Sequence, residues 1–157
     1  MLRLSIPGRG SYELRYLVLD VNGTLTRDGE LIPGVEERLG QLRTLLEVRL
    51  ISADTFGRLD AVAARLGLPA RRLSAGGPES EQKARFVGEL GPAGVLAIGN
   101  GANDAGMLRA AAVGIAVMGP EGSALEALLA ADVVVTSILD ALDLVRFPGR
   151  LVATLRR

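Results

Sequence analysis

The chain has 157 residues, 48% of them hydrophobic, and its 18 basic residues equal its 18 acidic ones. This length can bury one core of ordinary size, so we expect a single domain over residues 1–157. The balanced charge gives no reason to expect nucleic acid or an anionic membrane as a partner. Cysteine and histidine are absent, which excludes disulfides, thiolate nucleophiles and a histidine base.

No segment is expected to cross a membrane. The longest apolar stretch, near residues 110–118, is too short and contains Gly114. Arg3, Arg9 and Arg15 interrupt any apolar run at the N-terminus, so a secretory leader is not expected either. A cytoplasmic location is the prediction.

The first predicted elements are short strands joined by turns. Leu2–Ile6 and Tyr12–Leu14 flank Pro7-Gly8-Arg9-Gly10, which predicts an N-terminal β-hairpin. A buried strand follows over Tyr16–Asp20. A second, smaller hairpin is predicted over Thr26–Leu31, around the Asp-Gly turn at residues 28–29.

From residue 33 onward, predicted helices and strands alternate with short links. The patterns favour helices over about 33–46, 56–66, 79–90, from after 104 to 112, and 122–130, with terminal helices beyond residue 135. Strands are expected over 48–51, 72–74, 95–98, 113–117 and 133–135. This alternation is typical of an α/β fold in which a mostly parallel sheet lies between two layers of helices.

Polar residues follow three of the predicted strands. They are Asp20, Ser52 and the cluster of Asn100, Asn103 and Asp104. A polar turn after a strand is common and needs no function. However, the C-terminal ends of parallel strands meet at one crevice, so the three turns together predict a site. Oxygen ligands of this kind suit a hard cation such as Mg²⁺.

Lys83 is the only lysine in the chain, and the other 17 basic residues are arginines. A compact ammonium suits a point-charge contact with a phosphoryl oxygen better than a planar guanidinium does. Composition alone could also leave one lysine at this position.

These motifs resemble, in order and over nearly the whole chain, those of the haloacid dehalogenase (HAD) superfamily. Asp20-Val21-Asn22-Gly23-Thr24-Leu25-Thr26 resembles the first motif, Ser52 the second and Lys83 the third. The fourth motif, Gly-Asp-Gly-x-Asn-Asp-x-x-Met-Leu, is similar to the segment that runs from Gly99 to Leu108. The chain is most similar to soluble proteins that resemble the phosphorylation domain of P-type ATPases.

The resemblance implies a HAD-like Rossmannoid three-layer sandwich and a Mg²⁺-dependent phosphatase that forms an aspartyl phosphate on Asp20. It implies catalytic roles for Asp20, Asn22, Ser52 and Lys83. It implies phosphate binding by Gly23, Thr24, Ser52, Ala53, Lys83 and Asn103. The metal ligands that it implies are Asp20, Asn22 through its backbone carbonyl, Asn100 and Asp104.

Two positions depart from the family pattern. HAD phosphatases carry an acid–base Asp where this chain has Asn22, and general acid–base catalysis is worth about 10²–10⁴-fold. P-type ATPases carry Thr there, which fits a longer-lived phosphoenzyme. The second departure is Asn100, where the HAD family usually has a metal-binding Asp. We therefore expect slow hydrolysis and weaker Mg²⁺ binding. The alternative is a catalytically degenerate HAD domain that binds phosphate or regulates a partner.

The short intervals between the motifs predict that the chain has no cap domain. An open site suits a phosphorylated small molecule or a phosphoprotein, and capless relatives often form homo-oligomers, so an oligomer is expected.

Two other classes fit less well. A response-regulator receiver domain places its Lys after a late strand, whereas Lys83 precedes the Asn-Asp cluster. A dinucleotide-binding loop needs a third glycine, which the segment after residue 99 lacks.

Overall fold

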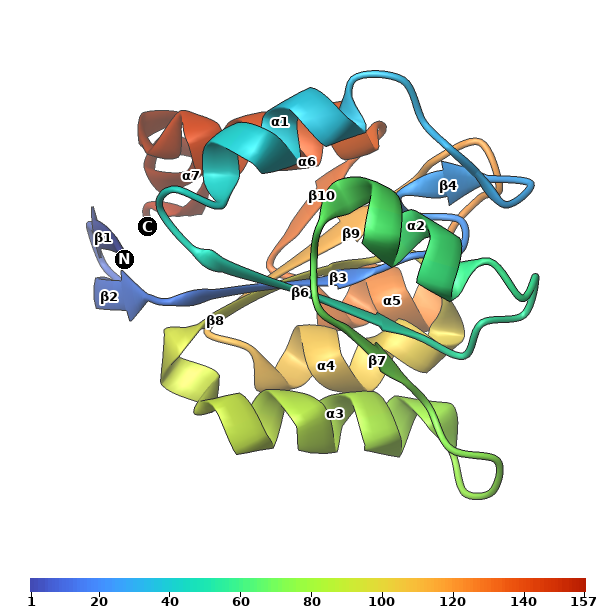
Figure 1. Cartoon of the computed structure of the whole chain (residues 1–157). Helices are drawn as coiled ribbons and strands as arrows, with labels where there is room; N and C mark the ends of the chain where they lie inside the picture. The colour runs from blue at the N-terminus through green and yellow to red at the C-terminus, as the bar shows by residue number, and fades with distance from the viewer.

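A computed structural model describes residues 1–157 and shows a parallel sheet between two layers of helices (Figure 1). The sheet has the order β10-β9-β8-β3-β6-β7, and every neighbouring pair is parallel. Its strands are β3 (Tyr16–Asp20), β6 (Glu47–Ser52), β7 (Ala70–Arg72), β8 (Val95–Gly99), β9 (Val113–Val117) and β10 (Val133–Val135). β8 and β9 are buried throughout, as the inner strands of a parallel sheet must be.

The chain runs outward from β3 to β6 and β7, and then returns to β8 on the other side of β3. The strand order therefore reverses between β3 and β8. In open α/β sheets, ligands bind at the carboxyl ends of the strands at this point.

Two hydrophobic clusters separate the sheet from its helices. The larger cluster lies under α1 (Val35–Leu42), α2 (Leu59–Leu66), α6 (Ile138–Arg146) and α7 (Pro148–Leu155). The smaller one lies against α3 (Glu79–Leu90), α4 (Ala105–Ala110) and α5 (Leu125–Ala130). Successive residues of β3 point to opposite faces, so Leu17 and Leu19 join the first cluster and Val18 joins the second. The three layers are thus fixed by alternation along the strands.

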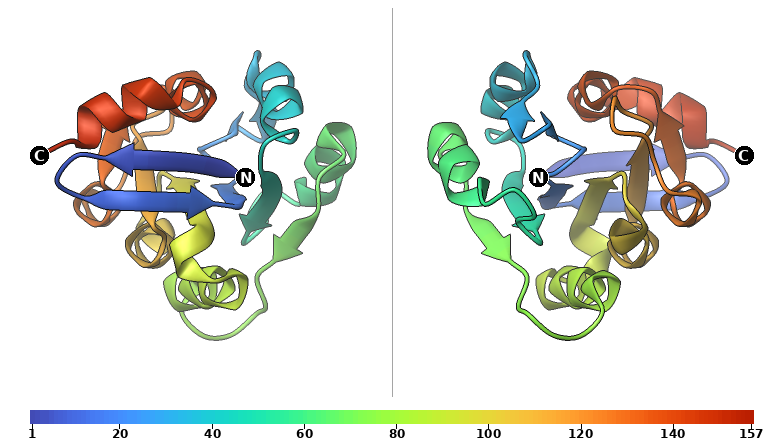
Figure 2. Two further views of the ribbon diagram at one scale, coloured as in Figure 1. Left: turned by 90° about the vertical axis from the view of Figure 1, so that its left-hand side faces the viewer. Right: turned by 90° about the vertical axis from the view of Figure 1, so that its right-hand side faces the viewer.

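Two antiparallel hairpins lie at opposite ends of the sheet. β1 (Leu2–Ile6) and β2 (Gly10–Leu14) form a hairpin that crosses the end where the strands begin (Figure 2), and Arg9 pairs with Asp132 at 2.6 Å. β4 (Thr26–Arg27) and β5 (Glu30–Leu31) form the second hairpin, which we call the flap. The flap lies at the end where β3 finishes (Figure 1).

No extra domain interrupts these elements. Only the flap and α1 lie between β3 and β6, and only α2 and β7 lie between β6 and α3. Two short 3-10 helices, η1 (Pro92–Gly94) and η2 (Ala102–Asp104), complete the chain. None of the helices combines the length and the apolar character needed to traverse a lipid bilayer.

The predicted order of elements is confirmed, but several predicted helices are too long. The helix expected from residue 33 begins at Val35, because Gly34 has a φ of 90°, and it ends at Leu42 in tight turns. The helix expected from residue 56 begins at Leu59, because Asp54 and Gly57 are left-handed, with φ of 58° and 65°.

Three further boundaries also differ. The strand expected at 72–74 lies at 70–72, where it pairs with Leu50–Ser52 of β6. The helix expected to reach residue 112 ends at Ala110, because Ala111 is extended. The helix expected from residue 122 begins at Leu125, because a turn with a Gly119–Gly122 bridge precedes it.

Candidate active site

Asp20 is the last residue of β3 and stands at the carboxyl end of the sheet with 4% of its surface exposed. The chain then turns tightly, with the N–H groups of residues 24, 25 and 26 all donating to the Val21 carbonyl. Gly23 has a φ of 76°, and a Cβ there would lie 2.7 Å from Nδ2 of Asn100. The turn therefore requires glycine both for its backbone conformation and for its space.

Lys83 enters the same pocket from α3. Its Nζ lies 2.6 Å from Oδ1 of Asp20 and 2.7 Å from Oδ1 of Asp104, and its side chain is fully buried. The structure therefore brings Asp20, Lys83 and Asp104 into direct contact, while their roles stay predictions. Two ammonium hydrogens are engaged by the carboxylates, which leaves the third for a further acceptor.

The burial of these charges shifts their titration. Burial, together with the negative charge of Asp104, raises the pKa of Asp20 from its ordinary 3.8 to about 6, against the opposing effects of Lys83 and the Thr24 hydroxyl. Burial by itself disfavours the Lys83 ammonium, but the two carboxylates outweigh it and raise the pKa of Lys83. Lys83 is therefore a fixed positive charge beside Asp20.

Asp104 has both of its carboxylate oxygens engaged by the chain. Oδ1 accepts from Lys83, and Oδ2 accepts from the N–H groups of Asn100 and Gly101, each at 2.8 Å. A Cβ at Gly99 would lie 2.5 Å from the carboxylate carbon of Asp104, so glycine at the end of β8 makes this approach possible. Asp104 thus holds both Lys83 and the loop after β8, and its role as a metal ligand stays a prediction.

Thr24 links Asp20 to Asn100. Its Oγ1 lies 2.9 Å from Oδ2 of Asp20 and 3.0 Å from Oδ1 of Asn100. A hydroxyl has only one hydrogen to donate, so the two acceptors share it. Both oxygens keep lone pairs for another positive partner.

Ser52 ends β6 and is buried beside the first motif. Its Oγ accepts from the Asp54 N–H at 2.8 Å, and Nδ2 of Asn22 lies 3.4 Å away. The Ser52 hydroxyl hydrogen remains available to a ligand oxygen. Ala53, which follows directly in the chain, is half-buried.

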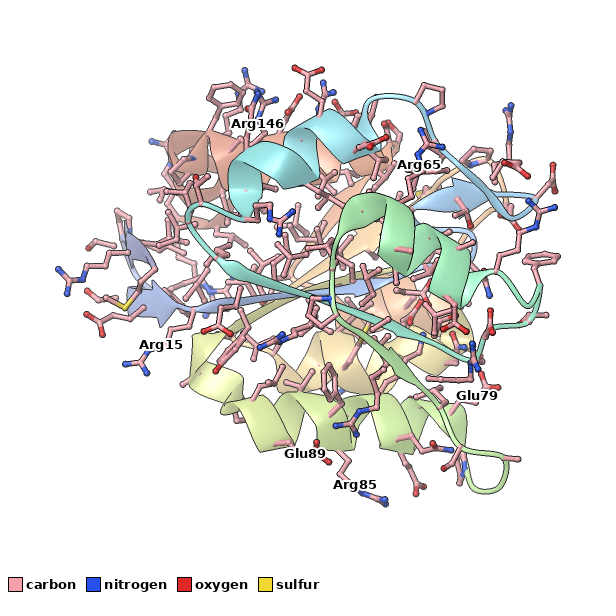
Figure 3. The ribbon with its side chains drawn as sticks, in the orientation of Figure 1. Arg15, Arg65, Glu79, Arg85, Glu89 and Arg146 are labelled. Carbon is pink, nitrogen blue, oxygen red and sulfur yellow. The ribbon has the colours of Figure 1, made fainter.

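The Asn103 side chain is bonded to a residue outside the predicted site. Its Nδ2 donates to Oε2 of Glu79 at 2.7 Å. Glu79 opens α3 and lies at the same end of the sheet as the flap, whereas Arg15 lies at the opposite end (Figure 3). Phosphate binding by Asn103 stays a prediction.

Sequence reasoning did not single out Glu79, Asp54 or the segment around Gly122, all of which contact site residues. Asp54 had a usable signal, since it lies two residues after Ser52; its Oδ1 accepts from the Leu59 N–H that opens α2, and its Oδ2 pairs with Arg72. Glu79 and Gly122 carry no such signal, because their contacts depend on how separate loops meet.

The donor set suits a magnesium ion, although weakly. Asp20 Oδ2 and Asn100 Oδ1 converge on one shared hydroxyl hydrogen, and both are hard oxygen ligands. Mg²⁺ commonly rests on one or two carboxylates with water and substrate oxygens as its other ligands. No group of three acidic side chains gathers here, so affinity should be modest.

Comparison with solved structures defines the class of fold. The chain superposes on the deoxy-D-mannose-octulosonate 8-phosphate phosphatase of Haemophilus influenzae with a TM-score of 0.68, over 85% of this chain and 87% of that one, at 15% identity. It matches the 3-deoxy-D-manno-octulosonate 8-phosphate phosphatase of Moraxella catarrhalis with a TM-score of 0.63, over 91% and 94%, at 19% identity. A phosphoserine phosphatase matches with a TM-score of 0.66, over 87% and 99%, at 15% identity. The chain therefore has the HAD fold, without a cap domain.

Two proteins of Methanocaldococcus jannaschii are closer in sequence. Uncharacterized protein MJ0073 is 48% identical over 62 residues, which are 40% of this chain and 67% of that protein. Uncharacterized protein MJ0072 is 46% identical over 39 residues, 25% of this chain and 89% of that protein. The chain belongs to the same family as these two archaeal proteins. No model of a protein family matches it.

Proposed function

We propose that the protein is a Mg²⁺-dependent phosphohydrolase that works through an aspartyl phosphate on Asp20. The observation that carries this proposal is the buried Lys83 ammonium, held between Asp20 and Asp104 at the carboxyl end of β3. A fixed cation beside a strand-end carboxylate is what in-line attack on a phosphoryl group needs.

In the proposed reaction an Asp20 oxygen attacks phosphorus, the bond from phosphorus to the leaving oxygen breaks, and an acyl phosphate forms. The remaining hydrogen of Lys83 and the Ser52 hydroxyl would donate to the phosphoryl oxygens as charge develops. Water would then attack phosphorus, release inorganic phosphate and restore the carboxylate.

The residues that would hold the magnesium ion are Asp20, Asn100 and the backbone carbonyl of Asn22, with Asp104 behind them. The ion would neutralise phosphoryl charge and let the Asp20 carboxylate approach the anionic substrate.

Both chemical steps should be slow, because no free acid or base faces Asp20. Asn22 has an amide where a proton-transferring acid is needed. Asp104 is committed to Lys83 and two backbone amides, and Glu79 is exposed and bonded to Asn103. The leaving group must depart without a proton, so acyl and aryl phosphates should react best.

Two structural neighbours support the proposal in different ways. The Moraxella catarrhalis phosphatase was solved with magnesium and phosphate ions, and the phosphoserine phosphatase was solved as a phospho-aspartyl intermediate analogue. Those are properties of these proteins. For this chain, the two neighbours favour a phosphorylated substrate, either a small molecule or a phosphoprotein. The expected homo-oligomer and the likeness to P-type ATPases are further proposals.

The second candidate is a phosphate-binding or regulatory module without turnover. It is favoured by the two amides, Asn22 and Asn100, that stand where HAD phosphatases carry carboxylates.

Turnover of acetyl phosphate and p-nitrophenyl phosphate with Mg²⁺ separates the two candidates. We expect slow turnover by the native protein, none by Asp20→Asn, and a gain of about 10²-fold in Asn22→Asp, which regains a proton-transferring group. If the native protein and Asn22→Asp, both folded, are as inert as Asp20→Asn, the binding module is the better account.

A further inference from the structure

The Asn100 side chain is engaged at both of its ends. Its Oδ1 lies 3.0 Å from Oγ1 of Thr24, and its Nδ2 donates to the Gly122 carbonyl at 3.2 Å. Reversing the amide would set an oxygen against the Gly122 carbonyl oxygen, where no hydrogen bond can form. The contacts therefore fix the orientation of the amide.

Gly122, which accepts from this amide, belongs to residues 118–124, which we call the wall loop. The main-chain carbonyl of Asn100 accepts from the Ser123 hydroxyl and from the Ala124 N–H, each at 2.9 Å. A Cβ on Gly119 would lie 3.5 Å from the Gly23 carbonyl. The wall loop thus packs against both the Asn100 loop and the turn that follows Asp20.

The wall loop also reaches the flap. Oε2 of Glu121 accepts from the Asp28 N–H at 3.3 Å. Glu30, in β5 of the flap, pairs with Arg58. A continuous series of hydrogen bonds and backbone links therefore runs from Asp20 through Thr24, Asn100 and the wall loop to the tip of the flap.

We propose that Asn100 is a positioning residue that fastens the wall loop, and through Glu121 the flap, to the phosphoryl-accepting turn. The amide is required because one end must accept a hydrogen bond and the other must donate one. A carboxylate has no hydrogen to donate to Gly122, and it would add a negative charge beside Asp20. Replacing Asn100 by Asp would thus loosen the wall of the site rather than simply restore a metal ligand. The reaction that this wall serves rests on the proposed function, but the contacts do not.

Backbone hydrogen exchange, followed by mass spectrometry without metal or substrate, tests this inference. Asn100→Asp and Asn22→Asp place the same charge in the same pocket, so they form a matched pair. We expect Asn100→Asp to speed exchange in residues 26–31 and 118–124 by about five- to tenfold, the scale of one lost hydrogen bond. Asn22→Asp should leave both segments near their native rates.

Glu121→Ala separates the link to the flap from the effect of charge. It should speed exchange in the flap while the wall loop changes less. Glu126→Ala removes an exposed acid of α5 that forms no ion pair, and it should change neither segment.

The inference is wrong if Asn100→Asp keeps native exchange in both segments, or if Asn22→Asp loosens them equally. Flap exchange that Glu121→Ala leaves unaltered would also contradict it. Because no substrate is present, these outcomes do not depend on whether Asp20 is ever phosphorylated.

Discussion

Lys83, Asp20 and Asp104 form a buried group of one positive and two negative charges. Burying a charge is costly unless a partner compensates for it, and Lys83 is the cation that compensates both carboxylates. Lys83 is thus as important for stability as for the proposed chemistry. Its replacement should leave two carboxylates facing each other in a dry pocket.

We predict that Lys83→Met lowers the free energy of unfolding by roughly 3–5 kcal/mol, the range for breaking a buried ion pair. Urea denaturation measures this loss. Arg85→Ala on the same helix is the control, because Arg85 is exposed and forms no ion pair, so its change should stay within about 0.5 kcal/mol. A loss below about 1 kcal/mol for Lys83→Met would contradict the buried arrangement.

The raised pKa of Asp20 makes stability depend on pH in a definite direction. The pKa of Asp20 is 3.8 in the unfolded chain and about 6 in the fold. Between these values the folded protein keeps a proton that the unfolded chain has lost. The stability gained from that proton is full below pH 3.8 and is lost as the pH rises through 6.

Asp20→Asn removes this ionisation, so it should be more stable than the native protein at neutral pH. A pKa difference of this size corresponds to about 3 kcal/mol at most above pH 7, and the gain should shrink toward pH 4.5. Urea titrations in EDTA from pH 4.5 to 8 would show it. If the gain in stability does not vary with pH, folding does not raise the pKa of Asp20, and the prediction is wrong.

At the scale of elements, α2 shows how one side chain fixes a helix start. Asp54 is left-handed, and its carboxylate accepts the Leu59 N–H at 2.8 Å while pairing with Arg72 at 2.9 Å. Unpaired N–H groups at a helix start are commonly satisfied by such a side chain. The loop from Ser52 to α2 is thereby held against β7.

Asp54→Ala should therefore cost about 1 kcal/mol of stability and speed hydrogen exchange in the first turn of α2. Asp54→Asn keeps the acceptor and tolerates the left-handed backbone, so it should retain most of the protection. Equal losses in the two variants would show that the charge contact with Arg72, rather than the hydrogen bond, secures the loop.

The order of elements was predictable because each strand and helix has its own local periodicity. The ends of α1, α2 and α5 were not, since left-handed residues and tight turns at positions such as Gly34, Asp54 and Gly122 shorten the apparent helical runs. The hydrophobic spacing of a helix continues past these residues although their backbone is not helical.

For the whole molecule, the strand-end motifs predicted that Asp20 and Asp104 would meet, because a parallel sheet brings its carboxyl ends together. Lys83 lies on α3, and only its being the one lysine and the family resemblance pointed to it. The bonds from Asn103 to Glu79 and from Asn100 to Gly122 could not be predicted, since each joins residues more than 20 positions apart through loop orientation. Sequence also gave no sign of the hollow of about 620 Å³ that Arg15 and Gly91 line, which does not include Asp20.

Asp20 has only 4% of its surface exposed and stands at the end of β3, the end of the sheet where the flap also lies (Figure 1). On the proposed function, we expect only the phosphoryl group of a substrate to reach so buried a carboxylate, with the rest of the substrate on the surface. Specificity would then come from the flap, the wall loop and whatever surface the substrate itself carries.

The central claim is that Asp20 accepts a phosphoryl group, and the most direct measurement is mass spectrometry of the protein after incubation with acetyl phosphate and Mg²⁺ and quenching in acid. We predict one phosphoryl group on the peptide containing Asp20, removable by hydroxylamine and absent from Asp20→Asn. A folded protein that gains no phosphoryl group, or gains one at another residue, would contradict the account.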